Sequence, residues 1–231
     1  MSETQPEQRL PAEAAAPTSQ PVFARKEGMW SRGSGDTSGY GGVVRDLAMP
    51  GISEGPFGEP FDTIHSRALA VLPGLADARF LFDRGELTIY VPREELLDVV
   101  RQFRDDAHLR FEVCVSVSGV HYPQQKGAEL HAVYHLLSYT HNRRVRLEVT
   151  CPEEDPHIPS VVATYPMTDY HEREAWDMFG IIFDGHPSLT RILMPDDWQG
   201  HPQRKDYPLG GVDVEYKGAK VPSPDNRRKY S

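Results

Sequence analysis

Alternating apolar and polar residues predict a small antiparallel sheet in the middle of the chain. A short helix pattern at residues 62–71 precedes an apolar run at residues 80–82 and an alternating strand over residues 87–91. Residues 92–105 are expected to form a helix, because their apolar side chains fall on one face and Pro92 suits a first helical turn. These elements predict a hairpin with one helix packed on it.

Three more strands are expected after this hairpin. Residues 111–118 and 144–149 carry an apolar side chain at every second position, and residues 130–139 form a strand of mixed facing. One buried and one wet face is typical of antiparallel strands. The predicted fold class is therefore α+β: a small, mostly antiparallel sheet with packed helices, followed by an irregular extended C-terminal segment.

The pattern changes towards the C-terminus. Short helices are expected at residues 160–165 and 169–179, the second with Asp169 and Glu172 at capping-box spacing and Gly180 as its left-handed stop. Turns and brief extended pieces follow. The sequence therefore predicts four segments: a flexible arm over residues 1–42, an α+β domain over 43–165, a segment of helix plus loops for partner binding over 166–212, and an extended tail over 213–231.

The N-terminal arm is rich in Pro, Ala, Ser and Gly. Alone it cannot bury enough apolar surface to offset the entropy lost on ordering. Gly33, Gly35 and Gly39 lack the spacing of a phosphate-binding loop, no strand precedes them, and no Gly-Lys-Ser/Thr follows. A flexible arm is therefore expected rather than a nucleotide site.

Composition excludes several function classes. The net charge of the 231 residues is −9, so the chain is a poor match to a phosphate backbone and no nucleic-acid partner is expected. No run approaches the ~20 apolar residues that span a bilayer, and the N-terminus lacks the basic and apolar regions of a signal peptide. Membrane association is expected only through partners.

The two cysteines, Cys114 and Cys151, do not form a Cys-x-x-Cys motif. They cannot supply the four thiolates of a usual iron–sulfur cluster. We expect two reduced and inert thiols, and no cofactor or metal in this chain.

Residues 170–209 are unusually dense in charged, aromatic, Gly and Pro residues, with almost no periodic apolar pattern. Arg173 and Asp177 are i, i+4 neighbours that are expected to pair on the helix surface. The favoured interpretation is a charge network that locks this helix onto the following loop through Arg191 or Arg204. Such charges need fixed partners if they are to be buried.

Two catalytic alternatives remain for this segment. One is a general acid–base pair of Glu172 with Asp177 or Glu174, which no nucleophile accompanies. The other is a zinc or iron site built from residues that recur at intervals of fifteen, together with nearby carboxylates: His171, His186 and His201 with Asp177, Asp196 or Asp197.

Two of these histidines lie in identical Gly-His-Pro triplets, at His186 and His201. The simpler interpretation is that such a triplet shapes a turn of the backbone and binds no metal. Gly permits an unusual φ, Pro fixes the next one, and the imidazole caps a nearby carbonyl.

Aromatic and arginine side chains in the same segment suggest a binding surface, because Trp, Tyr and Arg are common at interface hot spots. The predicted interface consists of ten side chains that combine charge with aromatic area: Glu172, Arg173, Asp177, Arg191, Trp198, His201, Arg204, Lys205, Asp206 and Tyr207.

The segment also resembles the signature of the C subunit of NADH-quinone oxidoreductase, the proton-pumping respiratory complex I. It departs from that pattern at Tyr170, where Trp is expected, and at Gln203, where Leu is expected. The matching positions are Glu172-Arg173-Glu174, Asp177-Met178-Phe179-Gly180-Ile181, Phe183, Gly185-His186-Pro187, Leu189, Arg191-Ile192-Leu193, Asp197-Trp198, Gly200-His201-Pro202 and Arg204-Lys205-Asp206-Tyr207-Pro208-Leu209.

The resemblance implies a non-catalytic subunit of the peripheral arm that braces the quinone-site D subunit and neighbours the B and I subunits. The complex would carry FMN, iron–sulfur clusters and quinone on other subunits. It would lie on the cytoplasmic side of the bacterial plasma membrane. The alternatives are the equivalent subunit of a membrane-bound hydrogenase or other quinone-reducing dehydrogenase, a stand-alone metal-dependent hydrolase, and an adaptor domain unconnected with respiration.

Overall fold

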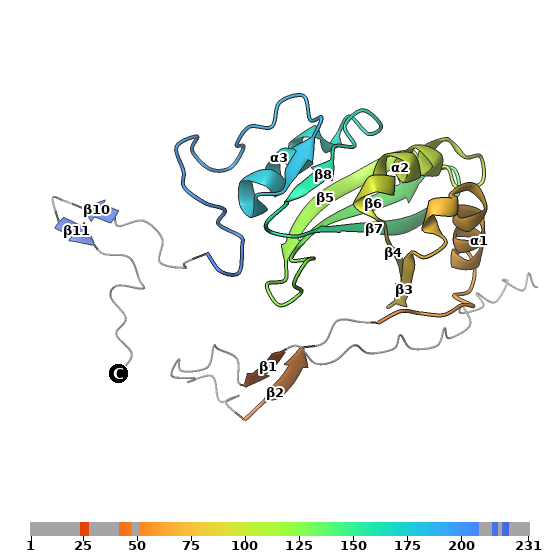
Figure 1. The fold of residues 1–231 in the computed structure, drawn as a ribbon, viewed down its shortest axis with the longest axis horizontal. Coiled ribbons are helices and arrows are strands. Elements are labelled where there is room, and N and C mark those ends of the chain that lie inside the picture. Colours follow the sequence, from red (N-terminus) through yellow and green to blue (C-terminus); the bar gives the residue numbers. More distant parts are fainter. Residues whose placement is uncertain (1–23, 28–41, 48–50, 208–213, 217–218, 222–231) are drawn as a thin grey trace, which may run out of the picture.

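The structure is a computed structural model that describes residues 24–27, 42–47, 51–207, 214–216 and 219–221 (Figure 1). Its helices are α1 (Phe61–Val71), α2 (Leu96–Asp105) and α3 (Thr168–Phe179), with 3₁₀ turns at Pro73–Leu75 and Arg93–Glu95. Its strands are β1 (Ala24–Glu27), β2 (Val44–Leu47), β3 (Arg79–Asp83), β4 (Glu86–Tyr90), β5 (Val113–His121), β6 (Leu130–Ser138), β7 (Arg143–Cys151), β8 (His157–Pro159), β9 (Ile182–Asp184), β10 (Val214–Tyr216) and β11 (Ala219–Val221).

A five-stranded sheet in the order β3-β4-β7-β6-β5 forms the framework of the domain. Its neighbours are antiparallel except for β4 and β7, which run parallel. The α+β fold class with a mostly antiparallel sheet is confirmed. The parallel pair was not predicted, since the alternation of apolar residues does not show which distant strand is the neighbour.

One face of the sheet is apolar because strand residues alternate in and out of the core. Tyr134 pairs with Leu147 and Ala132 with Val149, and all four side chains are buried. The same core takes in the buried faces of α1 and α2 and the end of α3. The core also extends back to Phe57, which precedes the helix pattern predicted at residues 62–71.

Residues 160–165 form turns instead of the predicted helix, so this local prediction is wrong. The N–H of Tyr165 donates to the carbonyl of Val161 over 2.8 Å, but the pattern does not continue. The physical reason lies in α3. The buried carboxylate of Glu172 takes the Val161 N–H and the Ser160 hydroxyl, and thereby holds the chain in a turn.

Short parallel strands β8 and β9 join the chain before α3 to the chain after it. Among the described residues, no helix is long and apolar enough to cross a membrane. The glycine run that was weighed as a phosphate loop lies outside the described residues, as do most of the predicted arm and tail. In the arm, β1 pairs antiparallel with β2 at the start of the predicted domain, and in the tail β10 pairs antiparallel with β11.

Candidate partner interface

Helix α3 carries two fully buried carboxylates, Glu172 and Asp177. Its N-cap residue is Met167 and no side chain caps it, so the predicted capping box of Asp169 and Glu172 is wrong. Glu172 instead points into the domain and accepts hydrogen bonds from Ser160 Oγ at 2.6 Å and the Val161 N–H at 2.8 Å. Burial raises the pKa of Glu172 to about 7, against the opposing effect of these donors.

The loop after β9 is organised around the Asp177 carboxylate. Its Oδ2 accepts the backbone N–H groups of Ile192, Leu193 and Met194 at 3.1, 2.8 and 2.9 Å. Its Oδ1 receives Arg191 Nη1 at 2.5 Å. Burial opposes ionisation of this carboxyl, but the three N–H groups and Arg191 outweigh it and lower its pKa. The predicted network through Arg191 is confirmed.

The predicted Arg173–Asp177 pair is not formed. Arg173 donates instead to the carbonyls of Thr190 and Arg191, at 3.1 and 3.0 Å. Asp177 lies on the buried side of the helix, where it is saturated by closer donors. Arg173 therefore fastens the same loop from the outer side of α3.

The last turn of α3 leaves four backbone carbonyls that the helix itself cannot satisfy. Each one has a partner in the chain that follows: Trp176 O accepts from Gly180 N at 2.8 Å, Asp177 O from His201 Nδ1 at 3.0 Å, Met178 O from Gln203 N at 3.1 Å, and Phe179 O from Arg204 Nε at 2.6 Å.

Gly180 is needed here for two reasons. Its φ of 80° is the left-handed conformation expected for the end of a helix, and a Cβ would lie 2.7 Å from the His201 ring. His201 and His186 cap carbonyls, of Asp177 and Asp169 respectively, and the glycine before each has a positive φ. The interpretation of Gly-His-Pro as a triplet that shapes a turn of the backbone is confirmed.

His121, a fully buried side chain at the end of β5, was not among the predicted site residues. Its Nδ1 accepts the Lys205 N–H at 2.9 Å, and its Nε2 lies 2.9 Å from Glu153 Oε1. Arg204 Nη1 approaches the same carboxylate at 3.5 Å. The only signal in the sequence was a histidine at an inward-facing position of an alternating strand.

His121, Glu153 and Asp206 place their ligand atoms within 4.8 Å of one another, a spacing that could suit a metal ion. The hydrogen bonding argues against such a site. Because Nδ1 accepts the Lys205 N–H, the proton of the neutral ring must sit on Nε2, whose lone pair is then not free for a metal. Arg204 next to Glu153 adds an opposing positive charge.

The structure does not gather the residues of the two catalytic alternatives. Glu172 and Asp177 have separate donors, and Glu174 is exposed. His186 and His201 use a ring nitrogen on different carbonyls, while Asp196 and Asp197 lie exposed in the loop.

The ten predicted interface side chains separate into two groups. Glu172, Arg173, Asp177, Arg191, His201 and Arg204 make the internal contacts described above, and Arg191 also donates to the carbonyls of Trp198 and Gly200. In the second group, the side chain of Trp198 is half-buried. Lys205 and Asp206 are exposed, and Tyr207 donates to the Gln199 carbonyl at 3.3 Å. Contact of these residues with a partner stays a prediction.

Replacing Asp177 by Asn should destabilise the fold by about 3–5 kcal/mol, because Arg191 loses its buried counter-charge. Urea unfolding of the purified chain measures this as a lower midpoint with an unchanged slope. Glu174→Gln is the matched control, since Glu174 is exposed on the same helix. Equal midpoints for the two variants would contradict the role of Asp177.

Glu172 should make stability fall as pH rises between about 4.5 and 7. Its pKa is higher in the folded than in the unfolded state, so the folded state holds the extra proton in this window and loses the advantage above it. Glu172→Gln should remove this part of the pH dependence, a difference of roughly 3 kcal/mol between the two ends. Parallel profiles for both proteins, from urea unfolding at several pH values, would refute the assignment.

Comparison with known proteins identifies the family. The family described as respiratory-chain NADH dehydrogenase, 30 Kd subunit, matches residues 89–213. The C subunit of NADH-quinone oxidoreductase from Nocardioides sp. is 58% identical over 230 residues, covering 97% of this chain and 92% of that protein. The protein of the same name from Streptomyces coelicolor is 61% identical over 203 residues, covering 85% and 81%.

A solved structure has the same fold. It is that of the membrane-bound sulfane sulfur reductase, an archaeal respiratory membrane complex. The matching chain is 23% identical with a TM-score of 0.56, over 65% of this chain and 87% of that one. The sequence matches go further than the fold: this chain belongs to the family of the 30 kDa subunit of respiratory-chain NADH dehydrogenase, which is the C-subunit family of NADH-quinone oxidoreductase.

Proposed function

We propose that this chain is a non-catalytic subunit of the peripheral arm of the proton-pumping NADH:quinone oxidoreductase, where it braces the quinone-site D subunit. The B and I subunits are proposed as further neighbours, on the cytoplasmic side of the bacterial plasma membrane. Relatives 58% and 61% identical carry the name of that enzyme's C subunit, which favours this role over a hydrogenase subunit, a stand-alone hydrolase or an unrelated adaptor.

The observation that carries the proposal is the rigid loop held by Asp177. The N–H groups of Ile192 and Leu193 are fixed by its carboxylate, yet their side chains are 37% and 59% exposed. Tyr170, 62% exposed, lies next to Arg173, which is tied to the same loop. Apolar side chains displayed on a fixed backbone are suited to docking, because little entropy remains to be lost on association.

The redox chemistry is proposed to lie in other subunits, which would hold FMN, the iron–sulfur clusters and the quinone. Burial raises the pKa of both Cys114 and Cys151 to about 12. Iron ligation needs the thiolate, which burial disfavours. The two cysteines also belong to different strands, β5 and β7, with β6 between them.

Leu193→Asp should weaken assembly without unfolding the chain. A carboxylate cannot be buried against an apolar partner surface without a large desolvation cost, whereas on the free chain it stays in water. Purification through a tag on this chain should recover at least about tenfold less of the quinone-site subunit, in keeping with a loss above about 1.4 kcal/mol.

Ile52→Asp is the control for this experiment, because Ile52 is 53% exposed at a site remote in sequence from the loop. The NADH-oxidising module should still reduce an artificial acceptor in both variants. Recovery of the quinone-site subunit at the control's level with Leu193→Asp would argue against this loop as the docking surface.

The double variant Cys114→Ser with Cys151→Ala should leave every cluster signal of the purified complex unchanged in electron paramagnetic resonance. It should also keep quinone reduction, since neither thiol is expected to bind iron. Loss of one cluster signal at normal complex yield would overturn the assignment of the redox centres to other subunits.

A further inference from the structure

A cavity of about 860 Å³ opens beside the β6–β7 turn, remote from the Asp177 loop in the sequence. Its walls come from β4, β5, β6, β7 and the start of α1, and include Glu86, Ser116, His135, Tyr139, Arg144 and Arg146. None of these residues takes part in the contacts around α3. Its volume is in the range of small-molecule sites.

The floor of this cavity is a row of polar side chains across three strands. Arg146 of β7 pairs with His135 of β6, and His135 pairs with Ser116 of β5. The buried neighbours Leu147 and Tyr134 point into the core, so Arg146 and His135 lie on the opposite face of the sheet. Ser116 Oγ and His135 Nδ1 are 3.1 Å apart.

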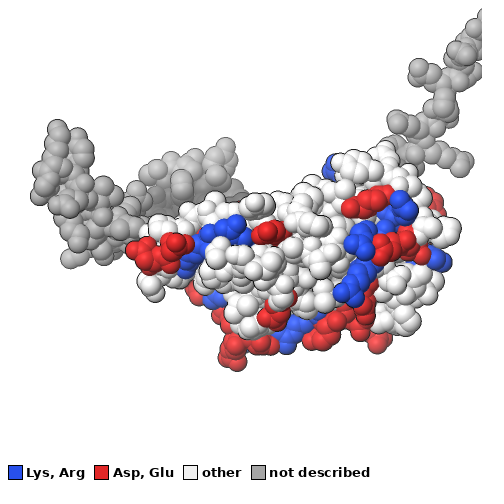
Figure 2. All heavy atoms as spheres, turned by 90° about the horizontal axis from the view of Figure 1, so that it is seen from above, with Lys and Arg blue, Asp and Glu red and all other residues white. Residues whose placement is uncertain are grey.

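The cavity is positively charged although the chain as a whole is acidic. Its described lining contains Arg143, Arg144, Arg146 and one carboxylate, Glu86, which pairs with Arg146. Arg143 is buried and donates to the carbonyls of His108 and Leu109, so Arg144 is the fully exposed arginine of this lining. Partial burial lowers the pKa of His135, and the charges of Arg146 and Arg144 lower it further. On the face drawn in Figure 2, acidic and basic side chains are interleaved.

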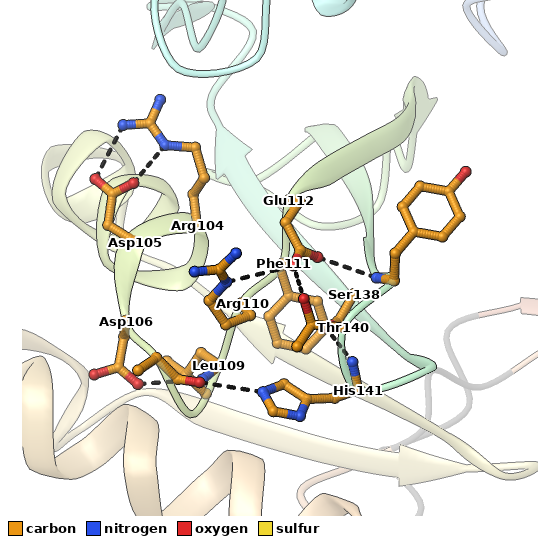
Figure 3. Close-up of polar contacts among 12 residues, drawn as sticks. Arg104, Asp105, Asp106, Leu109, Arg110, Phe111, Glu112, Ser138, Thr140 and His141 are labelled. Atoms are coloured by element: carbon orange, nitrogen blue, oxygen red, sulfur yellow. Dashed lines mark hydrogen bonds and ion pairs between the residues drawn. The ribbon is translucent and has the colours of Figure 1, made fainter.

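The rim of the cavity is held by another carboxylate that accepts a backbone N–H, Glu112. Glu112 accepts the Tyr139 N–H at 3.0 Å, the Thr140 hydroxyl, and Arg110 Nε at 3.4 Å (Figure 3). The pKa of Glu112 is lowered to about 2, mainly by the hydrogen bond from the Thr140 hydroxyl. Ser138 Oγ accepts the N–H of His141 at 3.1 Å, so the whole turn is fixed (Figure 3).

Two apolar side chains remain exposed on this fixed rim. Tyr139 is 72% exposed and Val115 is 44% exposed. A small oxyanion in the cavity would leave both in water, whereas an extended chain can cover them and reach the arginines together. Tyr and Arg on a rigid backbone are typical of interface hot spots.

We propose that this cavity is a docking site for an extended acidic segment of a neighbouring subunit. Carboxylates of that segment face Arg144 and Arg146, and an apolar side chain covers Tyr139 and Val115. The proposal rests on the proposed function only in requiring that the chain works in an assembled complex, and it concerns a surface separate from the Asp177 loop.

Site-specific crosslinking in the intact complex tests this directly. Tyr139 is replaced by photoreactive p-benzoylphenylalanine, the complex is purified through a tag on this chain, irradiated, and the adducts are mapped by mass spectrometry. One segment of another subunit should be crosslinked, with Asp and Glu outnumbering Lys and Arg. The same amino acid at Arg101, exposed on α2, is the control and should not label that segment.

Several outcomes would overturn the proposal. They are an intact complex without a crosslink from position 139, an adduct with phospholipid, an adduct with a neutral or basic segment, or an adduct within this chain's own N-terminal residues. If the tagged chain recovers no redox subunit at all, the proposed function fails and this inference fails with it. A recovered complex without the acidic adduct defeats this inference alone.

Charge reversal gives an independent measurement. Arg144→Glu should reduce recovery of the crosslinked subunit about tenfold, with a stronger effect at low salt. Arg101→Glu should not, and reversing one acid of the crosslinked segment to Lys should restore recovery with Arg144→Glu. Arg144 is exposed, so the chain should melt at the same temperature in both variants. Equal recovery for the two variants would refute the docking site.

Discussion

The C-terminal half of this structure depends on one buried carboxylate that accepts backbone hydrogen bonds. Asp177 is placed by α3, but three of its four close donors are the N–H groups of Ile192, Leu193 and Met194 in a loop with almost no apolar pattern of its own. Such a loop cannot be fixed by hydrophobic burial. A saturated carboxylate fixes three consecutive peptide units at once, and Arg191 supplies the charge that offsets the free-energy cost of its burial.

At the end of α3, backbone carbonyls also organise the chain that follows, by accepting hydrogen bonds from it. Its four unpaired carbonyls are taken by Gly180, His201, Gln203 and Arg204, so the chain beyond the helix is ordered by groups that the helix could not satisfy itself. This explains why the family pattern is so polar at these positions. It also explains the departure at residue 203, where Gln replaces Leu: that residue contributes its backbone N–H, and its exposed side chain is free to vary.

The sequence predicted the elements well wherever a local pattern decided them. Alternation in β5 and β7 and the apolar face of α2 reflect burial on one side, and Gly180 reflects a local φ requirement. It failed where a distant partner decided. Glu172 accepts hydrogen bonds from Ser160 and Val161 and does not take part in a capping box. Asp177 binds the 191–194 loop and not Arg173. Strand β4 pairs in parallel with β7. His121 was missed because its donor, Lys205, lies 84 residues away.

Glu112, just before β5, holds a surface turn in the same way that Asp177 holds the loop at residues 191–194. Each carboxylate accepts a backbone N–H from a surface turn, and each has a depressed pKa, so both stay ionised at neutral pH. Beside each, large side chains remain in water: Leu193 and Ile192 at one, Tyr139 at the other. For the docking role proposed above, surfaces that need no reordering on contact keep the entropy cost of association low. Carboxylates that bind the backbone beside Ile192, Leu193 and Tyr139 fix these exposed side chains without a larger hydrophobic core. The fixed side chains lie near the ends of the sheet and of α3.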